Sequence, residues 1–126
     1  MHKPNHVNSL RGRFLASSLM FKSYYVYILE CSDRSYYTGV TNDPDRRLVE
    51  HQSDEEPTSY TYSRRPVILK YVSHFQFIND AIEFEKQIKG WSRAKKEALF
   101  LEDWEEIVRL SNLKKRTEIS TLTGSV

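Results

Sequence analysis

The strongest constraint on the fold is a pair of aromatic and β-branched segments separated by a short polar stretch. Residues 24–30 (YYVYILE) and 36–41 (YYTGVT) are rich in the residue types that favour strands. Between them, residues 32–35 (SDRS) offer the small polar side chains that stabilise tight turns. The pattern predicts a β-hairpin at the start of the folded part of the chain.

Helix signals follow the hairpin and enclose one further strand. Asn42 and Asp43 are N-cap candidates, and Pro44 suits the first position of a helix. Gly90 is a typical residue at the end of a helix, and Ser92 can open another. We expect helices at 44–52, from Asn79 or Asp80 to Lys89 and at 93–101, a third strand at 67–75, and a further turn or helix at 103–110.

The expected order β-β-α-β-α-α defines a small α/β (α+β) domain, in which helices flank a three-stranded antiparallel sheet. With 126 residues the chain is long enough for one compact core but too short for two. Residues 1–22 contain no acidic residue and no sustained period, so we expect a poorly ordered N-terminal appendage. The domain is predicted to span 23–111, and 112–126 to form a polar, frayed tail.

Composition limits the kind of partner. Lys and Arg outnumber Asp and Glu by only 19 to 17, so a surface for nucleic acid must be local. The single cysteine, Cys31, cannot form an intrachain disulfide, and no cysteine–histidine grouping has zinc-site spacing, which favours the cytoplasm. No segment approaches the ~18 apolar residues that a bilayer span needs, so no membrane association is expected.

A carboxylate interrupts the apolar stripe of the second predicted helix. The stripe consists of Ile78, Ala81, Ile82, Phe84 and Ile88. Glu85 falls inside this stripe, whereas Glu83 lies on the outer arc of the helix. Turning a carboxylate toward a core is costly unless it is paired, hydrogen-bonded or bound to a metal. The pattern therefore leaves two interpretations of Glu85 open, a metal ligand or half of a buried salt bridge.

Arg47 and His51 are four residues apart and share one face of the first predicted helix. Leu48 lies between them in projection, so this face should adjoin the protein body. A guanidinium and an imidazole in such a position suit phosphate binding and proton transfer. Surface pairing with Glu50 or Asp54 is the alternative.

The hairpin should bring several tyrosines together. Tyr25 and Tyr27 share one face of the first strand, and Tyr37, Gly39 and Thr41 share one face of the second. Tyrosines in strands are ordinarily packing residues. Glycine weakens a strand and in mid-strand often marks close approach by another backbone or a ligand, so Gly39 is harder to explain as a packing residue.

Taken together, these residues resemble the GIY-YIG nuclease family in order and spacing. The matching residues are Tyr25-Val26-Tyr27, Tyr37-Thr38-Gly39, Arg47, His51 and Glu85. Tyr37 follows Tyr27 by ten positions, Arg47 follows Tyr37 by ten positions, and His51 follows Arg47 by four. The strings YVYILECSDRSYYTGVTNDPDRRLVEH and EFEKQIKGWSRAKKEAL are similar to the small single-domain branch of that family, which is related to the nuclease module of UvrC excision-repair proteins. The resemblance covers about three-fifths of the chain.

The resemblance implies an endonuclease that hydrolyses phosphodiester bonds of nucleic acid, with DNA preferred to RNA, in repair or recombination. Glu85, with Glu83 as the alternative, would hold one divalent cation, Mg²⁺ or Mn²⁺. Arg47 would bind the phosphate. Tyr37 or Tyr27 would orient and deprotonate the attacking water, and His51 would relay or accept the proton.

Two groups of residues are predicted to contact the substrate. The loop group could stack on bases and meet phosphates, and the helix group is basic. The loop group comprises Tyr60, Tyr62, Arg64 and Arg65, and the helix group comprises Lys86, Lys89, Arg93 and Lys96. The alternative function is a nucleic-acid-binding module with the same fold that cuts little or nothing.

Overall fold

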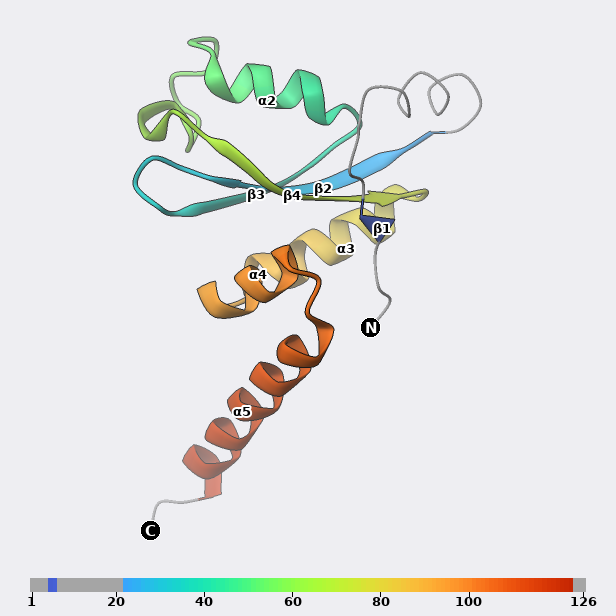
Figure 1. Ribbon diagram of the computed structural model, residues 1–126, viewed down its shortest axis with the longest axis vertical. Coiled ribbons are helices and arrows are strands. Elements are labelled where there is room, and N and C mark those ends of the chain that lie inside the picture. The colour runs from blue at the N-terminus through green and yellow to red at the C-terminus, as the bar shows by residue number, and fades with distance from the viewer. Residues whose placement is uncertain (1–4, 7–21, 124–126) are drawn as a thin grey trace. The chain divides into compact units, whose positions relative to one another are not determined.

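The structure is a computed structural model that describes residues 5–6 and 22–123 (Figure 1). The chain divides into two compact units, one up to Gly90 and one from Trp91 onward. The first unit contains the sheet, two α-helices and a short 3₁₀ helix, and the described part of the second contains two α-helices.

The sheet of the first unit is antiparallel, with strand order β1-β4-β2-β3. Its strands are β1 (Asn5–His6), β2 (Tyr24–Glu30), β3 (Tyr36–Thr41) and β4 (Ile68–Phe75). The predicted three-stranded antiparallel sheet is confirmed, and β1 adds two residues of pairing alongside β4. Strand β3 forms one edge of the sheet.

The hairpin turn uses the residues that the sequence indicated. The backbone N–H of Cys31 donates to the Ser35 carbonyl at 2.8 Å, and that of Arg34 donates to the Cys31 carbonyl at 2.9 Å. Arg34 adopts a left-handed conformation with φ of 73°. The Asp33 carboxylate accepts hydrogen bonds from the backbone N–H and the hydroxyl of Ser35, which closes the turn.

The two faces of the sheet are covered by different helices (Figure 1). Helix α2 (Pro44–Gln52) lies on the face that carries Tyr25, Tyr27 and Leu29, where its Leu48 packs against the core. Helix α3 (Ile78–Lys89) lies on the opposite face. Side chains alternate along a strand, so consecutive residues of β2 or β3 point to opposite faces of the sheet, one toward α2 and the next toward α3.

Helix α2 has the predicted limits. The Asp43 carboxylate accepts a hydrogen bond from the Arg46 backbone N–H at 3.1 Å, and Pro44 occupies the first helical position. The helix ends before Ser53, which is extended. This cap fixes where the helix begins and therefore which side chains face the sheet.

The predicted start of helix α3 is wrong. The helix begins at Ile78 after Phe77, whose side chain makes no capping hydrogen bond. Asn79 and Asp80 lie inside the first turn instead, where the Asp80 charge is favourable near the positive end of the helix dipole. The end at Lys89 before Gly90 is confirmed.

The second unit contains α4 (Arg93–Phe100) and α5 (Trp104–Thr123), which contact one another. Ser92 caps α4 as predicted, because its hydroxyl accepts a hydrogen bond from the Lys95 backbone N–H at 3.2 Å. The helix expected to end near residue 110 instead continues to Thr123, so residues 112–123 are helical rather than frayed. Among the residues that the structure describes, no helix combines the length and hydropathy needed to span a bilayer.

Candidate active site

A continuous chain of hydrogen bonds lies between helix α2 and the sheet. The Tyr27 hydroxyl from β2 lies 2.8 Å from Nε2 of His51. On the other side of the imidazole, Nδ1 lies 2.8 Å from Oγ1 of Thr61. Tyr27, His51 and Thr61 are all at least nine-tenths buried. Both ring nitrogens of His51 are therefore occupied by neutral hydroxyl groups away from bulk water.

Tyr37 and Arg47 complete this cluster. The Tyr37 ring packs edge-on against the His51 ring, with centroids 5.0 Å apart, and it lies 6.2 Å from the Tyr27 ring. The Arg47 guanidinium donates to Glu50 at 3.2 Å and to Glu56 at 3.3 Å. Four of the predicted catalytic residues thus lie together on one face of the sheet, and pairing of Arg47 with Glu50 is also present.

Gly39 is the residue that allows Tyr27 to lie where it does. The two residues pair across β2 and β3. A Cβ atom at position 39 would lie 2.5 Å from the Tyr27 hydroxyl oxygen and 2.6 Å from Cζ. Any larger residue would therefore have to displace a buried phenol that is hydrogen-bonded to His51. The mid-strand glycine makes room for the buried Tyr27 phenol.

Burial and local charge control the protonation of the cluster. Burial, followed by the neighbouring Tyr37, raises the pKa of Tyr27 well above its ordinary value. Burial and then the Arg47 charge lower the pKa of His51 to about 4. Burial opposes the charge of Arg47, but hydrogen bonds to Tyr27 and Glu50 outweigh that effect and raise the Arg47 pKa. At neutral pH the cluster therefore holds a neutral phenol, a neutral imidazole and a guanidinium cation.

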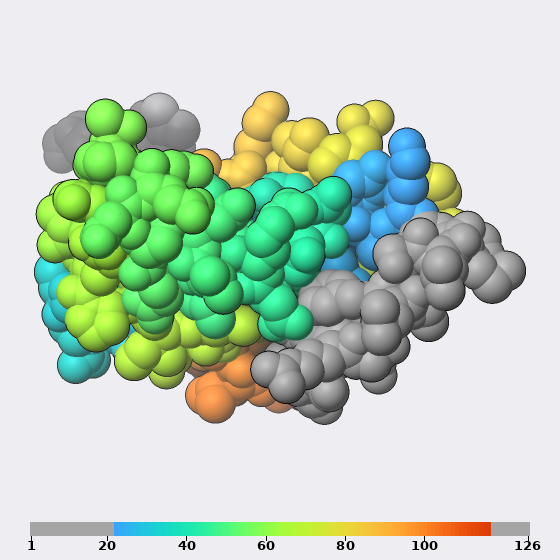
Figure 2. Space-filling model, turned by 90° about the horizontal axis from the view of Figure 1, so that it is seen from above, coloured from blue at the N-terminus to red at the C-terminus, as the bar shows by residue number. Residues whose placement is uncertain are grey.

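The segment that follows α2 folds over the cluster. Figure 2 shows α2 and the residues after it, coloured green, on this face of the molecule. The Tyr60 ring stacks on Tyr37, with centroids 6.0 Å apart, and its hydroxyl donates to the Ser35 hydroxyl. Arg64 lies 3.9 Å above the Tyr60 ring and pairs with Asp33. Two residues predicted to contact substrate thus also hold the segment against the hairpin.

The other two predicted loop residues behave similarly. The Arg65 guanidinium lies over the Tyr62 ring at 4.5 Å and donates to the Tyr62 carbonyl. It also pairs with Asp54 at 2.8 Å. Tyr62 and Arg64 belong to a short 3₁₀ helix at Tyr62–Arg64. Contact of these side chains with nucleic acid remains a prediction.

Glu85 lies on α3, on the face of the sheet opposite the tyrosine–histidine cluster. It is buried, whereas Glu83 is exposed, in agreement with the helical stripe. The Lys89 ammonium lies 2.5 Å from Glu85 Oε1 but is not aligned as a hydrogen-bond donor, so this oxygen has a counterion and no directed hydrogen bond. The ion-pair interpretation of Glu85 is thus present in the structure with Lys89 as the partner, and a metal ion on Oε1 would have to take the place of the ammonium.

The predicted helix group of basic residues belongs to both units. Lys86 and Lys89 are exposed residues of α3 in the first unit, whereas Arg93 and Lys96 belong to α4 in the second. Within the described ranges, no three histidine, cysteine or acidic side chains gather in a way that could hold a metal ion. A metal site here would rest on Glu85 with water molecules as the other ligands.

Sequence analysis did not identify Thr61 or Glu56 as members of the site. Neither residue belongs to a periodic segment or to a spaced motif. Their contacts depend on how residues 53–65 fold back onto α2, with Thr61 meeting His51 and Glu56 meeting Arg47. The length of this segment is the signal that could have drawn attention to it, because long loops in compact domains are often functional.

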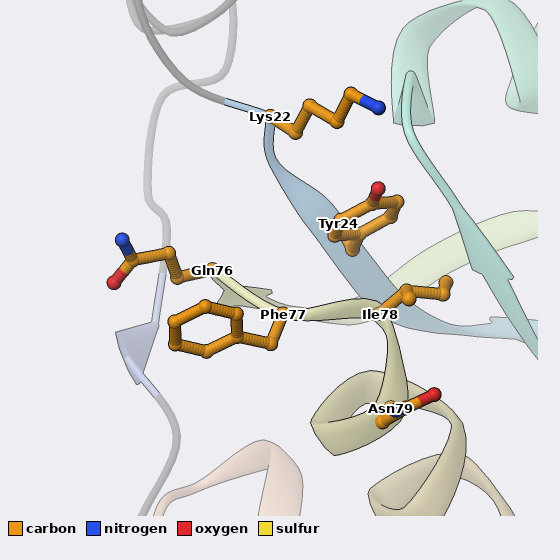
Figure 3. A pocket seen from close by; sticks show the side chains of 6 residues that line it. All are labelled: Lys22, Tyr24, Gln76, Phe77, Ile78 and Asn79. Carbon is orange, nitrogen blue, oxygen red and sulfur yellow. The ribbon is translucent and has the colours of Figure 1, made fainter.

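A separate depression of about 360 Å³ lies where β4 meets α3 (Figure 3). It is lined by Lys22, Tyr24, Gln76, Phe77, Ile78 and Asn79. Tyr24 faces the opposite side of β2 from Tyr27, because the two are three residues apart. This depression contains none of the predicted site residues.

A hairpin that carries two tyrosines, followed by a helix that presents an arginine and a histidine to them, matches the arrangement expected of a GIY-YIG nuclease. The model of the GIY-YIG catalytic domain matches residues 23–98, and the chain belongs to this nuclease family. A UPF0213 protein of Halobacterium salinarum is 46% identical over 61% of this chain and 99% of its own length. A UPF0213 protein of Syntrophus aciditrophicus is 47% identical over 57% of this chain and 83% of its own length. The solution structure of a UPF0213 protein of Bacillus halodurans is 43% identical and covers 61% of this chain and 81% of its own, with a TM-score of 0.41.

Proposed function

We propose that this chain is a metal-dependent endonuclease that hydrolyses phosphodiester bonds of DNA, in repair or recombination. The observation that carries the proposal is the convergence of Tyr27, Tyr37, Arg47 and His51 on one face of the sheet, with Tyr27 and His51 directly hydrogen-bonded. Phosphodiester hydrolysis needs a cation for the phosphate and a route for the proton of the attacking water. The cluster supplies both within one site.

Arg47 would bind the scissile phosphate. Its side chain is 24% exposed, so a substrate can reach it. Glu56 occupies part of the guanidinium, and its side chain is 51% exposed on the segment after α2. A phosphate oxygen would take the place of the Glu56 carboxylate, because both are anionic acceptors of the same donor.

Tyr37 and Tyr27 would divide the handling of water and proton. Tyr37 is the less buried of the two and would orient the attacking water. Tyr27 would pass its hydroxyl proton to Nε2 of His51 as it takes a proton from the water. An anionic phosphate beside the imidazole would favour its charged form and so offset the effect of burial on the His51 pKa.

Glu85 would hold the divalent cation, Mg²⁺ or Mn²⁺, with water completing the coordination. Its buried Oε1 already attracts a cation, the Lys89 ammonium at 2.5 Å, which the metal ion would have to displace. The bound ion would supply charge stabilisation for the phosphate and the leaving oxygen. The sheet separates α3, which carries Glu85, from α2, which carries Arg47, so the proposal requires the substrate and the metal ion to reach both faces.

The proposal is tested with labelled duplex, branched and single-stranded DNA, and with RNA, in Mg²⁺, Mn²⁺ or chelator. Cutting should need the metal and should be lost in Arg47→Ala and Glu85→Gln. Glu83→Gln is the matched control, because Glu83 is an exposed carboxylate on the same helix, and it should cut like the wild type. Cutting that survives both Arg47→Ala and Glu85→Gln would exclude this site. Binding without cutting on every substrate would favour the nucleic-acid-binding module instead.

A further inference from the structure

His51 has a second partner whose role the proposed reaction leaves unexplained. Oγ1 of Thr61 lies 2.8 Å from His51 Nδ1, and Thr61 is 1% exposed. We propose that Thr61 is a positioning residue that holds the hydrogen of the His51 ring on Nδ1, so that Nε2 is the acceptor that faces Tyr27. The inference rests on the proposed function of the cluster and adds to it the residue that sets its proton direction.

The donor and acceptor inventory supports this assignment. A neutral imidazole carries one hydrogen, so it can accept the Tyr27 proton at Nε2 only when that hydrogen is on Nδ1. The hydrogen on Nδ1 then needs an acceptor, and Thr61 Oγ1 is at hydrogen-bond distance. Oγ1 of Thr61 can accept because Ser59 Oγ, 3.2 Å away, can take the Thr61 hydroxyl hydrogen. The hydrogen bonds then run in one direction from Tyr27 to Ser59.

Burial makes the choice of tautomer consequential. His51 is 4% exposed, so water has little access to replace a missing partner of either ring nitrogen. Without the Thr61 hydroxyl, the Nδ1 hydrogen would be buried and unsatisfied, and the ring would favour the other tautomer with its hydrogen on Nε2. Nε2 would then donate to Tyr27 instead of accepting from it. The phenol would lose its proton acceptor although every proposed catalytic side chain was still present.

Position also matters, because Thr61 lies in the segment that covers the cluster. Tyr60, its neighbour in sequence, stacks on Tyr37, so the same turn that delivers Thr61 to His51 also packs against the second tyrosine. Residues 53–65 therefore complete the site from above, in addition to any contact with substrate. Within this mostly exposed segment, the hydrogen bond of Thr61 to His51 is buried and that of Thr61 to Ser59 is partly buried.

The test uses two substitutions that separate the hydroxyl from the packing of Thr61. Thr61→Val keeps the shape and removes the hydroxyl, whereas Thr61→Ser removes the methyl group and keeps the hydroxyl. The ring nitrogens of His51 are observed by ¹⁵N NMR at neutral pH, without substrate or metal. The wild type and Thr61→Ser should show one tautomer with the hydrogen on Nδ1, and Thr61→Val should lose it. An unchanged tautomer in Thr61→Val, or a wild type with the hydrogen on Nε2, would overturn the proposal.

Kinetics provide the second measurement. Thr61→Val should lower kcat for DNA cutting about 10- to 100-fold with little change in KM, because positioning errors act on the chemical step. Thr61→Ser keeps the hydroxyl and should keep a kcat close to that of the wild type. Equal kcat in the wild type and in Thr61→Val would also refute the positioning role. If the wild type cuts no DNA, the proposed function fails, while the NMR result still decides the tautomer assignment.

Discussion

Mild acid should destabilise this protein through His51, whereas a histidine whose pKa is the same in the folded and unfolded states would contribute nothing. The folded state lowers the pKa of His51 from its usual 6.5 to about 4, through burial and then through the Arg47 charge. The unfolded chain therefore binds a proton at higher pH than the folded chain does. By linkage, this contribution to stability is fully present above the unfolded pKa and is lost as the pH falls from 6.5 through 4.

The size of the effect follows from the two pKa values. A shift from 6.5 to about 4 corresponds to roughly 3 kcal/mol in total, of which about 2 kcal/mol is lost by about pH 5. Burial supports a figure of this order, because the His51 side chain has only 4% of its surface exposed. Against typical free energies of unfolding of about 5–15 kcal/mol, a loss of this size would be measurable.

The assay compares urea unfolding of the wild type and of His51→Gln, followed by circular dichroism at constant ionic strength. Both proteins share the same carboxylates, so their difference isolates His51. The wild type should lose about 2 kcal/mol relative to the variant between about pH 7 and pH 5. NMR titration of the His51 ring in the folded protein gives its pKa directly. A difference that does not change with pH, or a His51 ring that titrates near 6.5, would refute the reasoning.

Three further predictions concern packing, charge and capping. Gly39→Ala should lower the free energy of unfolding, measured by urea unfolding, by about 1–3 kcal/mol, and should weaken cutting, because its Cβ would lie 2.5 Å from the Tyr27 hydroxyl. A Gly39→Ala variant as stable as the wild type would contradict the close contact. Glu56→Gln should tighten DNA binding, measured by fluorescence anisotropy in chelator, because it removes an anionic competitor from Arg47; unchanged affinity would show that the pairing does not oppose the substrate. Asp43→Ala should cost about 1 kcal/mol in the same urea assay, because helix α2 loses its N-cap, and no loss would mean that the cap is dispensable.

The hairpin and α2 were predictable from the sequence because their determinants are local. Strand-forming runs on both sides of a turn set the limits of β2 and β3, and Asp43-Pro44 set the start of α2. The first residue of α3 was not predictable from the sequence. Asn79 and Asp80 are residue types that suit an N-cap, an acidic residue also suits the first turn, and Phe77 carries no local signal for the boundary. Local chemistry thus predicts that a helix or strand exists more reliably than it predicts the residue at which that element begins.

The tertiary part of the site was only partly predictable. The sequence pattern placed Tyr27 and Tyr37 on the two strands of a hairpin and placed Arg47 and His51 on one face of a helix. The structure brings these side chains together. Thr61 could not be found this way, because its contact with His51 depends on a segment without periodic pattern. Such a segment is specified by buried hydrogen bonds with distant partners, which a sequence pattern does not display.

The charges of the cluster indicate how the substrate must enter. Arg47 is paired with two carboxylates, Glu50 and Glu56, while Tyr27 and His51 are neutral at physiological pH. Arg46 also lies 3.9 Å from Glu50, so the group has a net charge of about zero, and the two carboxylates offset the attraction of the two guanidinium groups for a phosphate. Two changes would restore that attraction, namely displacement of Glu56 and binding of a divalent cation. Because Glu56→Gln accomplishes the first without the second, the variant should need less metal than the wild type for half-maximal DNA binding. Equal metal dependence of binding in both proteins would mean that Glu56 does not control access to Arg47.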